Sequence, residues 1–247
     1  MTLPESLAAG AATARALSAP DRPDLTHEGL RQLIADTVGR LNELGIGRND
    51  GVAIVLPNGP EMAAAFLAVA AGAATAPLNP AYREDELDFY LSDIGAKAII
   101  VGRDETGPSV TVAEKLGISV LRLNVADDAP AGSFTIDGAP VGPAVDTGFA
   151  QPDDVALYLH TSGTTSRPKL VPLSHKNVAA SARNIGETLG LEPDDRCMNI
   201  MPLFHIHGLI AAVLSSLASG GSVYCTPGFD ALRFFRWLED AKPTWYT

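Results

Sequence analysis

The sequence predicts an α/β protein with doubly wound, mostly parallel sheets that carry helices on both faces. Short runs that are apolar throughout, such as residues 51–56, alternate with longer segments whose apolar residues recur at helical spacing, such as residues 26–44. Strands that are apolar on both sides are typical of parallel sheets, because helices cover both of their faces. The apolar content of 46% and the charged content of 19% indicate a core-forming chain and exclude a disordered one.

The first half of the chain repeats this alternation. The helix predicted over 26–44 ends at Gly45, because glycine readily adopts the left-handed conformation that terminates helices. The strand predicted over 51–56 is closed by a turn that contains Pro57 and Gly59. Further helices are predicted over 60–71, 84–94 and 110–116, and further strands over 75–78, 97–101 and 118–123.

Residues 124–154 interrupt the alternation. The stretch is rich in Ala, Gly, Pro and Asp, and only residues 134–136 resemble a strand, so a surface excursion or a subdomain joint is predicted. We therefore expect a first α/β subdomain over residues 1–150 and the start of a second over 151–247. The second has predicted strands over 155–159, 197–200 and 222–225, predicted helices over 176–189, 208–218 and 231–240, and the beginning of another strand over 244–247.

The charge and hydropathy of the chain limit its partners. With 18 Lys and Arg against 29 Asp and Glu, the formal net charge is −11, so generic binding to nucleic acids is not expected. Nucleotides remain compatible with this charge, because backbone amides and one or two cations can hold their phosphates. The longest apolar stretch, residues 62–78, is rich in Ala and Gly, so a buried helix followed by a strand is predicted there and not a membrane span.

The two cysteines, Cys197 and Cys225, are too few for a disulfide framework or a metal-ligand cluster. Both lie in apolar runs, which predicts buried thiols in a reducing compartment. The first residues have no basic region ahead of an apolar segment, so no signal peptide is expected. Together these features predict a cytoplasmic protein.

The segment that most strongly suggests chemistry follows the strand predicted over 155–159. Gly163 allows the backbone to turn so that successive N–H groups point at one anion, and neighbouring hydroxyls add donors. Arg167 or Lys169 can neutralise a terminal phosphate. A polar loop without function is the competing interpretation, but doubly wound sheets bind their ligands after buried strands. The predicted phosphate-binding residues are Thr161, Ser162, Gly163, Thr164, Thr165, Ser166, Arg167 and Lys169.

Residues 161–169, TSGTTSRPK, resemble the phosphate-loop signature of the adenylate-forming (AMP-binding) enzymes, which include the acyl-CoA synthetases. Residues 201–208, MPLFHIHG, are similar to the Pro-x-Phe-His segment that follows this loop in the same family. The order and spacing of the two motifs make the resemblance specific. The loop departs from the family pattern at Ser166 and Leu170, where glycine is usual, and Leu170 restricts the backbone beside Lys169. The resemblance also extends over residues 55–59, 78–80 and 229–247.

The resemblance implies an ATP-dependent acid–CoA ligase. In such an enzyme a carboxylate attacks the α-phosphate of ATP to give an acyl-adenylate and pyrophosphate, and the CoA thiol then displaces AMP. By resemblance, the loop holds the β- and γ-phosphates together with Mg²⁺, for which the Thr164 hydroxyl is the expected ligand. His205 is the expected catalytic residue, shaping the carboxylate pocket. The implied partners are ATP, CoA and a small carboxylic acid, with no nucleic acid.

Within the family, Ser166 and Arg167, with His160 ahead of the loop, look most like the oxalate–CoA ligase branch. A dicarboxylate brings a second negative charge that needs a partner once it is buried, and the imidazoles of His205 and His207 can supply one. A substrate contact and a packing role are both open for His207, as are an orienting and a structural role for His160. If both pocket histidines only fill space, the alternative substrate is a medium-chain or aromatic acid.

By resemblance, the family's adenine-binding motif, its acidic magnesium-binding motif and its C-terminal domain with the catalytic lysine lie downstream of residue 247. We therefore expect a piece of the large N-terminal domain that has no turnover by itself. A non-catalytic nucleotide-binding or interaction module built on the same half-domain is the alternative. An ordinary P-loop NTPase is disfavoured, because the sequence lacks the Walker A pattern.

Overall fold

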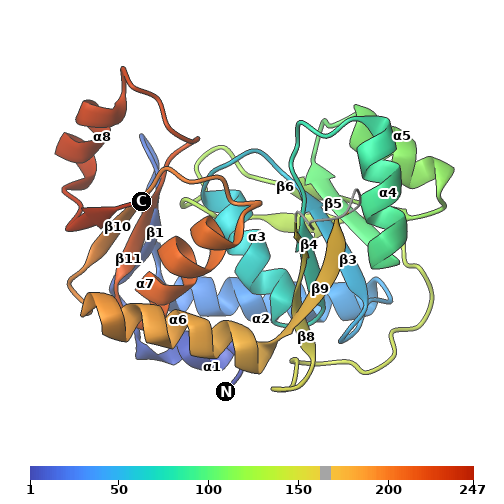
Figure 1. Ribbon diagram of the computed structural model, residues 1–247, viewed down its shortest axis with the longest axis horizontal. Helices are drawn as coiled ribbons and strands as arrows, with labels where there is room; N and C mark the ends of the chain where they lie inside the picture. Colours follow the sequence, from blue (N-terminus) through green and yellow to red (C-terminus); the bar gives the residue numbers. More distant parts are fainter. Residues whose placement is uncertain (162–167) are drawn as a thin grey trace.

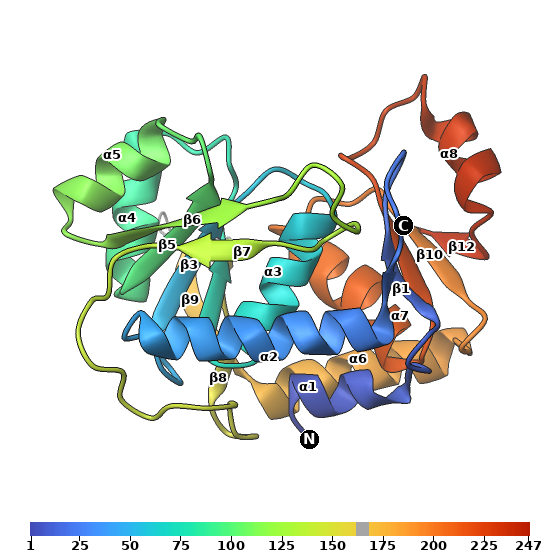
Figure 2. The ribbon, with the colours of Figure 1, turned by 180° about the vertical axis from the view of Figure 1, so that it is seen from behind.

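The computed structural model describes residues 1–161 and 168–247. In these parts of the chain the strands form two mostly parallel sheets, one of seven strands and one of five. Figures 1 and 2 show a layer of helices between the two sheets, with further helices on the outer face of each. The predicted α/β architecture, with mostly parallel sheets and helices on both faces, is therefore confirmed.

The seven-stranded sheet has the order β7-β6-β5-β3-β4-β8-β9, in which only the pairs at the two edges are antiparallel. The edge strand β9 was not predicted, because it contains Pro172 and begins at Lys169. Both residue types are typical of sheet edges, where a missing N–H leaves no partner unsatisfied. The strands are β3 (Gly51–Val55), β4 (Ala74–Pro77), β5 (Ala98–Gly102), β6 (Ser119–Asn124), β7 (Thr135–Asp137), β8 (Val155–Thr161) and β9 (Lys169–Ser174).

The five-stranded sheet has the order β12-β10-β11-β1-β2, and only the β1–β2 pair is antiparallel. The pairing of Leu17 with Val223 joins segments at opposite ends of the chain. Both sheets thus combine strands from each side of residue 150, and the division into 1–150 and 151–247 stays a prediction about domains. The strands are β1 (Arg15–Ser18), β2 (Leu25–Thr26), β10 (Arg196–Asn199), β11 (Ser222–Cys225) and β12 (Trp245–Tyr246).

The helices from α2 onward follow the predicted positions closely, and α4 has the predicted bounds, whereas α1 and η1 were not predicted. The helix predicted over 208–218 is divided into a π-helical segment, η2, and a short α-helix. The helical segments are α1 (Leu3–Ser6), the 3₁₀ turn η1 (Leu7–Ala9), α2 (His27–Glu43), α3 (Pro60–Ala70), α4 (Glu84–Ile94), α5 (Pro108–Lys115), α6 (His175–Leu189), η2 (His207–Leu214), α7 (Ser215–Ala218) and α8 (Phe234–Ala241).

The side chains of each central strand alternate between two apolar cores. In β3, Val52 and Ile54 pack into the layer between the sheets, whereas Ala53 and Val55 pack against α4 and α5 on the outer face. In β11, Val223 faces the same inner layer, and Tyr224 packs against α8. This alternation produces the succession of layers in Figure 1, from α4 and α5 on the right to α8 on the left.

The two cysteines are free and buried, as predicted. Burial raises the pKa of both thiols, that of Cys197 to about 12. Among the helices that the structure describes, none has the length and hydropathy needed to cross a membrane.

Thr75 links β4 to β8 inside the core, where its buried hydroxyl donates a hydrogen bond to the Ala156 carbonyl (2.8 Å). Replacing Thr75 with Val leaves that carbonyl without its donor, so the free energy of unfolding should fall by about 1–3 kcal/mol. Thr188→Val is the matched control, because the Thr188 hydroxyl also donates to a carbonyl, that of Asn184, but at an exposed position. Urea unfolding measures both, and equal losses in the two variants would contradict the role of Thr75.

Two buried imidazoles predict sensitivity to acid. His175 Nδ1 accepts a hydrogen bond from the Leu3 N–H (3.1 Å), and His27 Nε2 bonds to the Gly221 carbonyl (3.0 Å). Burial lowers the pKa of both rings, so the unfolded chain binds protons more readily than the folded one. The contribution of the two histidines to the free energy of unfolding should therefore be fully present above the pKa of about 6.5 that histidine has in the unfolded chain. It should be lost as the pH falls from there toward their lower pKa values in the folded protein.

The measurement is urea unfolding at about pH 7.5 and about pH 5.5, for the wild type and for His175→Asn. The asparagine oxygen can still accept from Leu3 but does not titrate, so the variant should lose less stability on acidification. An unchanged pH dependence in the variant would show that His175 is not a source of the acid sensitivity.

Candidate functional site

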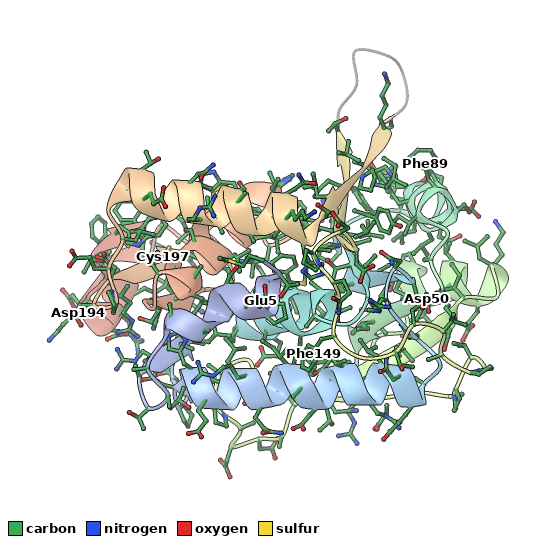
Figure 3. The ribbon with its side chains drawn as sticks, turned by 90° about the horizontal axis from the view of Figure 1, so that it is seen from below. Glu5, Asp50, Phe89, Phe149, Asp194 and Cys197 are labelled. Atoms are coloured by element: carbon green, nitrogen blue, oxygen red, sulfur yellow. The ribbon has the colours of Figure 1, made fainter. Side chains whose placement is uncertain are left out.

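The two ends of the candidate phosphate-binding segment lie opposite each other. Thr161 ends β8, Lys169 begins β9, and the two residues are register partners across the antiparallel pair. Figure 3 shows these strand ends projecting beyond the neighbouring helices. The other predicted phosphate-binding residues lie outside the described residues: Ser162, Gly163, Thr164, Thr165, Ser166 and Arg167.

A pocket of about 200 Å³ lies directly beside Thr161. It opens where the parallel strands β4 and β8 reach their carboxyl ends, the place at which open α/β sheets bind ligands. The structure therefore brings Thr161 and His205 together, although Thr161 ends a strand of the seven-stranded sheet and His205 lies in a connection of the five-stranded sheet. The pocket is lined by Pro77, Leu78, Asn79, Tyr82, Tyr90, Tyr158, Leu159, His160, Thr161, Phe204, His205 and Ile206.

Aromatic rings form one wall of this pocket. Tyr82 and Tyr90 stack with their ring centroids 4.8 Å apart, and the His160 ring meets Tyr90 edge-on at 4.6 Å. Burial, followed by the hydrogen bond with Tyr90, raises the pKa of Tyr82, which keeps its hydroxyl neutral. No motif in the sequence indicated these tyrosines, because Tyr82 precedes α4 and reaches the pocket only through tertiary packing.

His160 is anchored to α4. Its Nε2 lies 2.9 Å from Asp93 Oδ2, and only 7% of its side chain is exposed. Phe89, labelled in Figure 3 near the base of the β8–β9 hairpin, is also close to the His160 ring, with centroids 6.0 Å apart. His160 is therefore largely buried and fixes the end of β8, from which the candidate phosphate-binding segment departs.

His205 reaches the pocket from the second sheet. It lies between β10 and η2, where its N–H donates to the Pro202 carbonyl (3.3 Å) and its ring packs 4.5 Å from that of Phe204. His205 itself is exposed, so a ligand in the pocket can contact the imidazole. This position fits the predicted role of a residue that shapes a carboxylate pocket.

His207 lies in a different pocket from His205. Its Nε2 bonds to the Thr247 hydroxyl, and the surrounding cavity has a volume of about 570 Å³. The structure thus does not place the two histidines around one ligand-sized space. The His207 pocket is lined by Ser181, Asn184, Ile185, Thr188, Leu189, His207, Ala211, Trp245, Tyr246 and Thr247.

The described residues supply hydroxyl, imidazole and cationic groups to the site, but no ready-made metal centre. Within residues 1–161 and 168–247, no three His, Cys, Asp or Glu side chains cluster in a way that could hold a metal ion. The predicted Mg²⁺ ligand Thr164 lies outside these ranges. The arrangement is suited to binding an anion at the strand ends with a small acid beside it.

Known proteins resemble the chain over nearly its whole length but are about twice as long. Oxalate–CoA ligase from Arabidopsis thaliana is 41% identical over 241 residues, covering 94% of this chain and 46% of that protein. Oxalate–CoA ligase from Saccharomyces cerevisiae is 38% identical over 223 residues, covering 81% and 41% respectively. This chain therefore spans less than half the length of these relatives.

A solved structure has the same fold. The ATP-bound structure of MatB from Rhodopseudomonas palustris superimposes with a TM-score of 0.80 at 26% identity, covering 98% of this chain and 48% of that one. The family described as AMP-binding enzyme matches residues 5–247, which include both sequence motifs and both sheets. The resemblance inferred from the two motifs is thereby confirmed, and the chain belongs to the family of AMP-binding enzymes.

Proposed function

We propose that the protein is an AMP-forming acid–CoA ligase, which converts a carboxylic acid, ATP and CoA into an acyl-CoA thioester, AMP and pyrophosphate. One observation carries this proposal: Thr161 ends its strand beside a small pocket that also contains His205, and Lys169 is its register partner. A phosphate chain bound at these strand ends would have its α-phosphate close to an acid in that pocket.

The proposed chemistry activates a carboxylate, which is a poor electrophile with a poor leaving group. A carboxylate oxygen attacks the α-phosphorus, its bond to phosphorus forms, and the bond to the β-phosphate oxygen breaks, releasing pyrophosphate. The thiolate of CoA then attacks the acyl carbon, and AMP leaves. Donors from Thr161 to Lys169 would hold the β- and γ-phosphates. The Thr164 hydroxyl would be a ligand for Mg²⁺, which when bound would neutralise part of the phosphate charge.

We propose oxalate as the leading substrate. The two relatives described above are both named oxalate–CoA ligase. The described residues enclose a pocket of about 200 Å³, which has room for a small acid. The second carboxylate of oxalate needs a hydrogen-bonding or charged partner once it is buried. The exposed His205 imidazole lines the pocket and could be that partner. We propose a weaker, indirect contribution from His207, which lines the neighbouring cavity.

A larger apolar acid is the second candidate, and the His207 cavity favours it. That cavity includes Ile185, Leu189 and Trp245 and is more than twice as large as the His205 pocket. A relative from Mycobacterium tuberculosis named long-chain-fatty-acid–CoA ligase is 30% identical over 233 residues. A reducing, cytoplasmic setting is proposed for either substrate, because both cysteines are free thiols.

The phosphate-binding role is tested by replacing Thr164 and Lys169 together with Ala in the full-length protein. Loss of donors that stabilise a transition state should slow pyrophosphate release by about a hundredfold or more. Lys176→Ala is the control. Lys176 is also an exposed cation near the β8–β9 hairpin, but it forms an ion pair with Asp153. Pyrophosphate release that is unchanged in the double variant would refute the phosphate-binding role.

The substrate is tested by comparing kcat/KM for oxalate, malonate, octanoate and coumarate. We expect oxalate to be preferred, and His205→Phe to reduce its kcat/KM more than His207→Phe does, because only His205 lines the small pocket. A preference for octanoate or coumarate would refute oxalate and leave the ligase activity intact. Equal effects of the two variants would contradict the separate placement of the histidines.

A further inference from the structure

The side chain of Asn58 joins the two sheets by hydrogen bonds. Asn58 lies in the turn between β3 and α3, and β3 is a strand of the seven-stranded sheet. Its Oδ1 accepts from the Leu203 N–H (2.8 Å), and its Nδ2 donates to the Thr226 carbonyl (3.1 Å). Leu203 follows β10 and Thr226 follows β11, so both partners belong to the five-stranded sheet's connections.

The partners of Asn58 are themselves fixed by buried polar groups. The Thr226 hydroxyl donates to the Asn199 carbonyl (2.8 Å), and both residues are completely buried. The Asn199 amide donates to the Met201 carbonyl (3.1 Å) and accepts from the Met201 N–H (3.3 Å). Buried polar networks of this kind restrict the backbone to one arrangement, because each group left unpaired would be costly. The segment 199–203 is therefore held from both ends.

This segment leads directly into His205. Leu203 is anchored in the central core with 1% of its surface exposed. A Cβ on Gly208 would lie 2.7 Å from the Pro202 carbonyl oxygen, so the start of η2 packs tightly against the same segment. The backbone is consequently fixed both before and after His205, which limits where its side chain can lie.

The pocket beside Thr161 is divided between the two sheets. Its tyrosines, His160 and Thr161 belong to the seven-stranded sheet and its connections, whereas Phe204, His205 and Ile206 come from the other. β3, which leads to Asn58, is the neighbour of β4 in the first of these sheets. The Asn58 amide is therefore a directional contact between the halves of the molecule that contribute the two parts of the pocket.

We propose that Asn58 is a positioning residue, which sets the location of His205 relative to the Thr161 end of β8. This inference rests on the proposed ligase function. Its effect should fall on the use of the carboxylic acid, because His205 lies on the acid's side of the site. The binding of ATP should change little, because the phosphate-binding segment leaves from β8.

Asn42 provides a matched control. Its side chain also donates to one backbone carbonyl, that of Ile46 (2.9 Å), and accepts from one backbone N–H, that of Gly148 (2.8 Å). Asn42 lies in α2 and contributes nothing to the pocket. Loss of either asparagine side chain should reduce the free energy of unfolding to a similar degree. A difference in kcat/KM between the two variants would therefore report the positioning of His205 and not a general loss of stability.

The experiment compares Asn58→Ala, Asn58→Asp and Asn42→Ala in the full-length protein. Asn58→Ala should lower kcat/KM for the carboxylic acid by about tenfold to a hundredfold, as expected when a group that orients the substrate is misplaced. The KM for ATP should stay within about twofold of the wild type, and Asn42→Ala should change neither value by more than that. Asn58→Asp keeps the acceptor for the Leu203 N–H but cannot donate to the Thr226 carbonyl. It takes the place of the alanine variant in the kinetic comparison if that variant does not fold.

Amide hydrogen exchange of the peptide spanning 199–206 supplies a readout that does not depend on activity. Exchange should be faster in Asn58→Ala and unchanged in Asn42→Ala. Unchanged exchange in the Asn58 variants, or equal kinetic losses in the Asn58 and Asn42 variants, would overturn the proposal. A wild-type protein that releases no pyrophosphate with any acid would instead refute the proposed function, and hydrogen exchange would still decide whether Asn58 holds the segment.

Discussion

Helix α3 is buried on all sides between the two sheets, and the rest of the structure depends on this constraint. Every residue of α3 except Glu61 is buried. A helix that is apolar all round is stable only inside a protein, and its many alanines allow a sheet to approach from each side. Glu61 is paired at the helix start with Arg22 and accepts from the Gly132 N–H (3.2 Å). Together these contacts fix the separation of the sheets.

The site follows from that placement. Because the two sheets are held on either side of one core, the connection that carries His205 meets the carboxyl ends of β4 and β8. Hydrophobic packing fixes distances but has little directionality. The amide of Asn58 adds direction, since it forms hydrogen bonds to the backbone of Leu203 and Thr226, which follow strands of the other sheet. The pocket is thus a product of tertiary structure, shared by segments that are distant in the sequence.

The elements that were predicted correctly are those determined by residues close together in the sequence. The apolar runs predicted β3 and β11, and the sequence pattern predicted α4 with the bounds it has in the structure. The short strands β1 and β2 were missed, because they exist only through the pairing of β1 with β11. In the site, Thr161, Lys169 and His205 were predicted from motifs. Tyr82, Tyr90 and Asn58 were not assigned roles, because their partners are brought to them only by folding.

The proposed ligase reaction requires a carboxylate oxygen to become bonded to the α-phosphorus of ATP. The most direct measurement incubates the full-length protein with ATP, CoA and oxalate labelled with oxygen-18 in its carboxylates, and determines the isotope content of the nucleotide product by mass spectrometry. The acyl-adenylate route predicts AMP that carries one labelled oxygen, because the later attack of the thiol breaks the bond between the acyl carbon and that oxygen. Acyl-CoA formation with unlabelled AMP, or with ADP as the nucleotide product, would contradict the account.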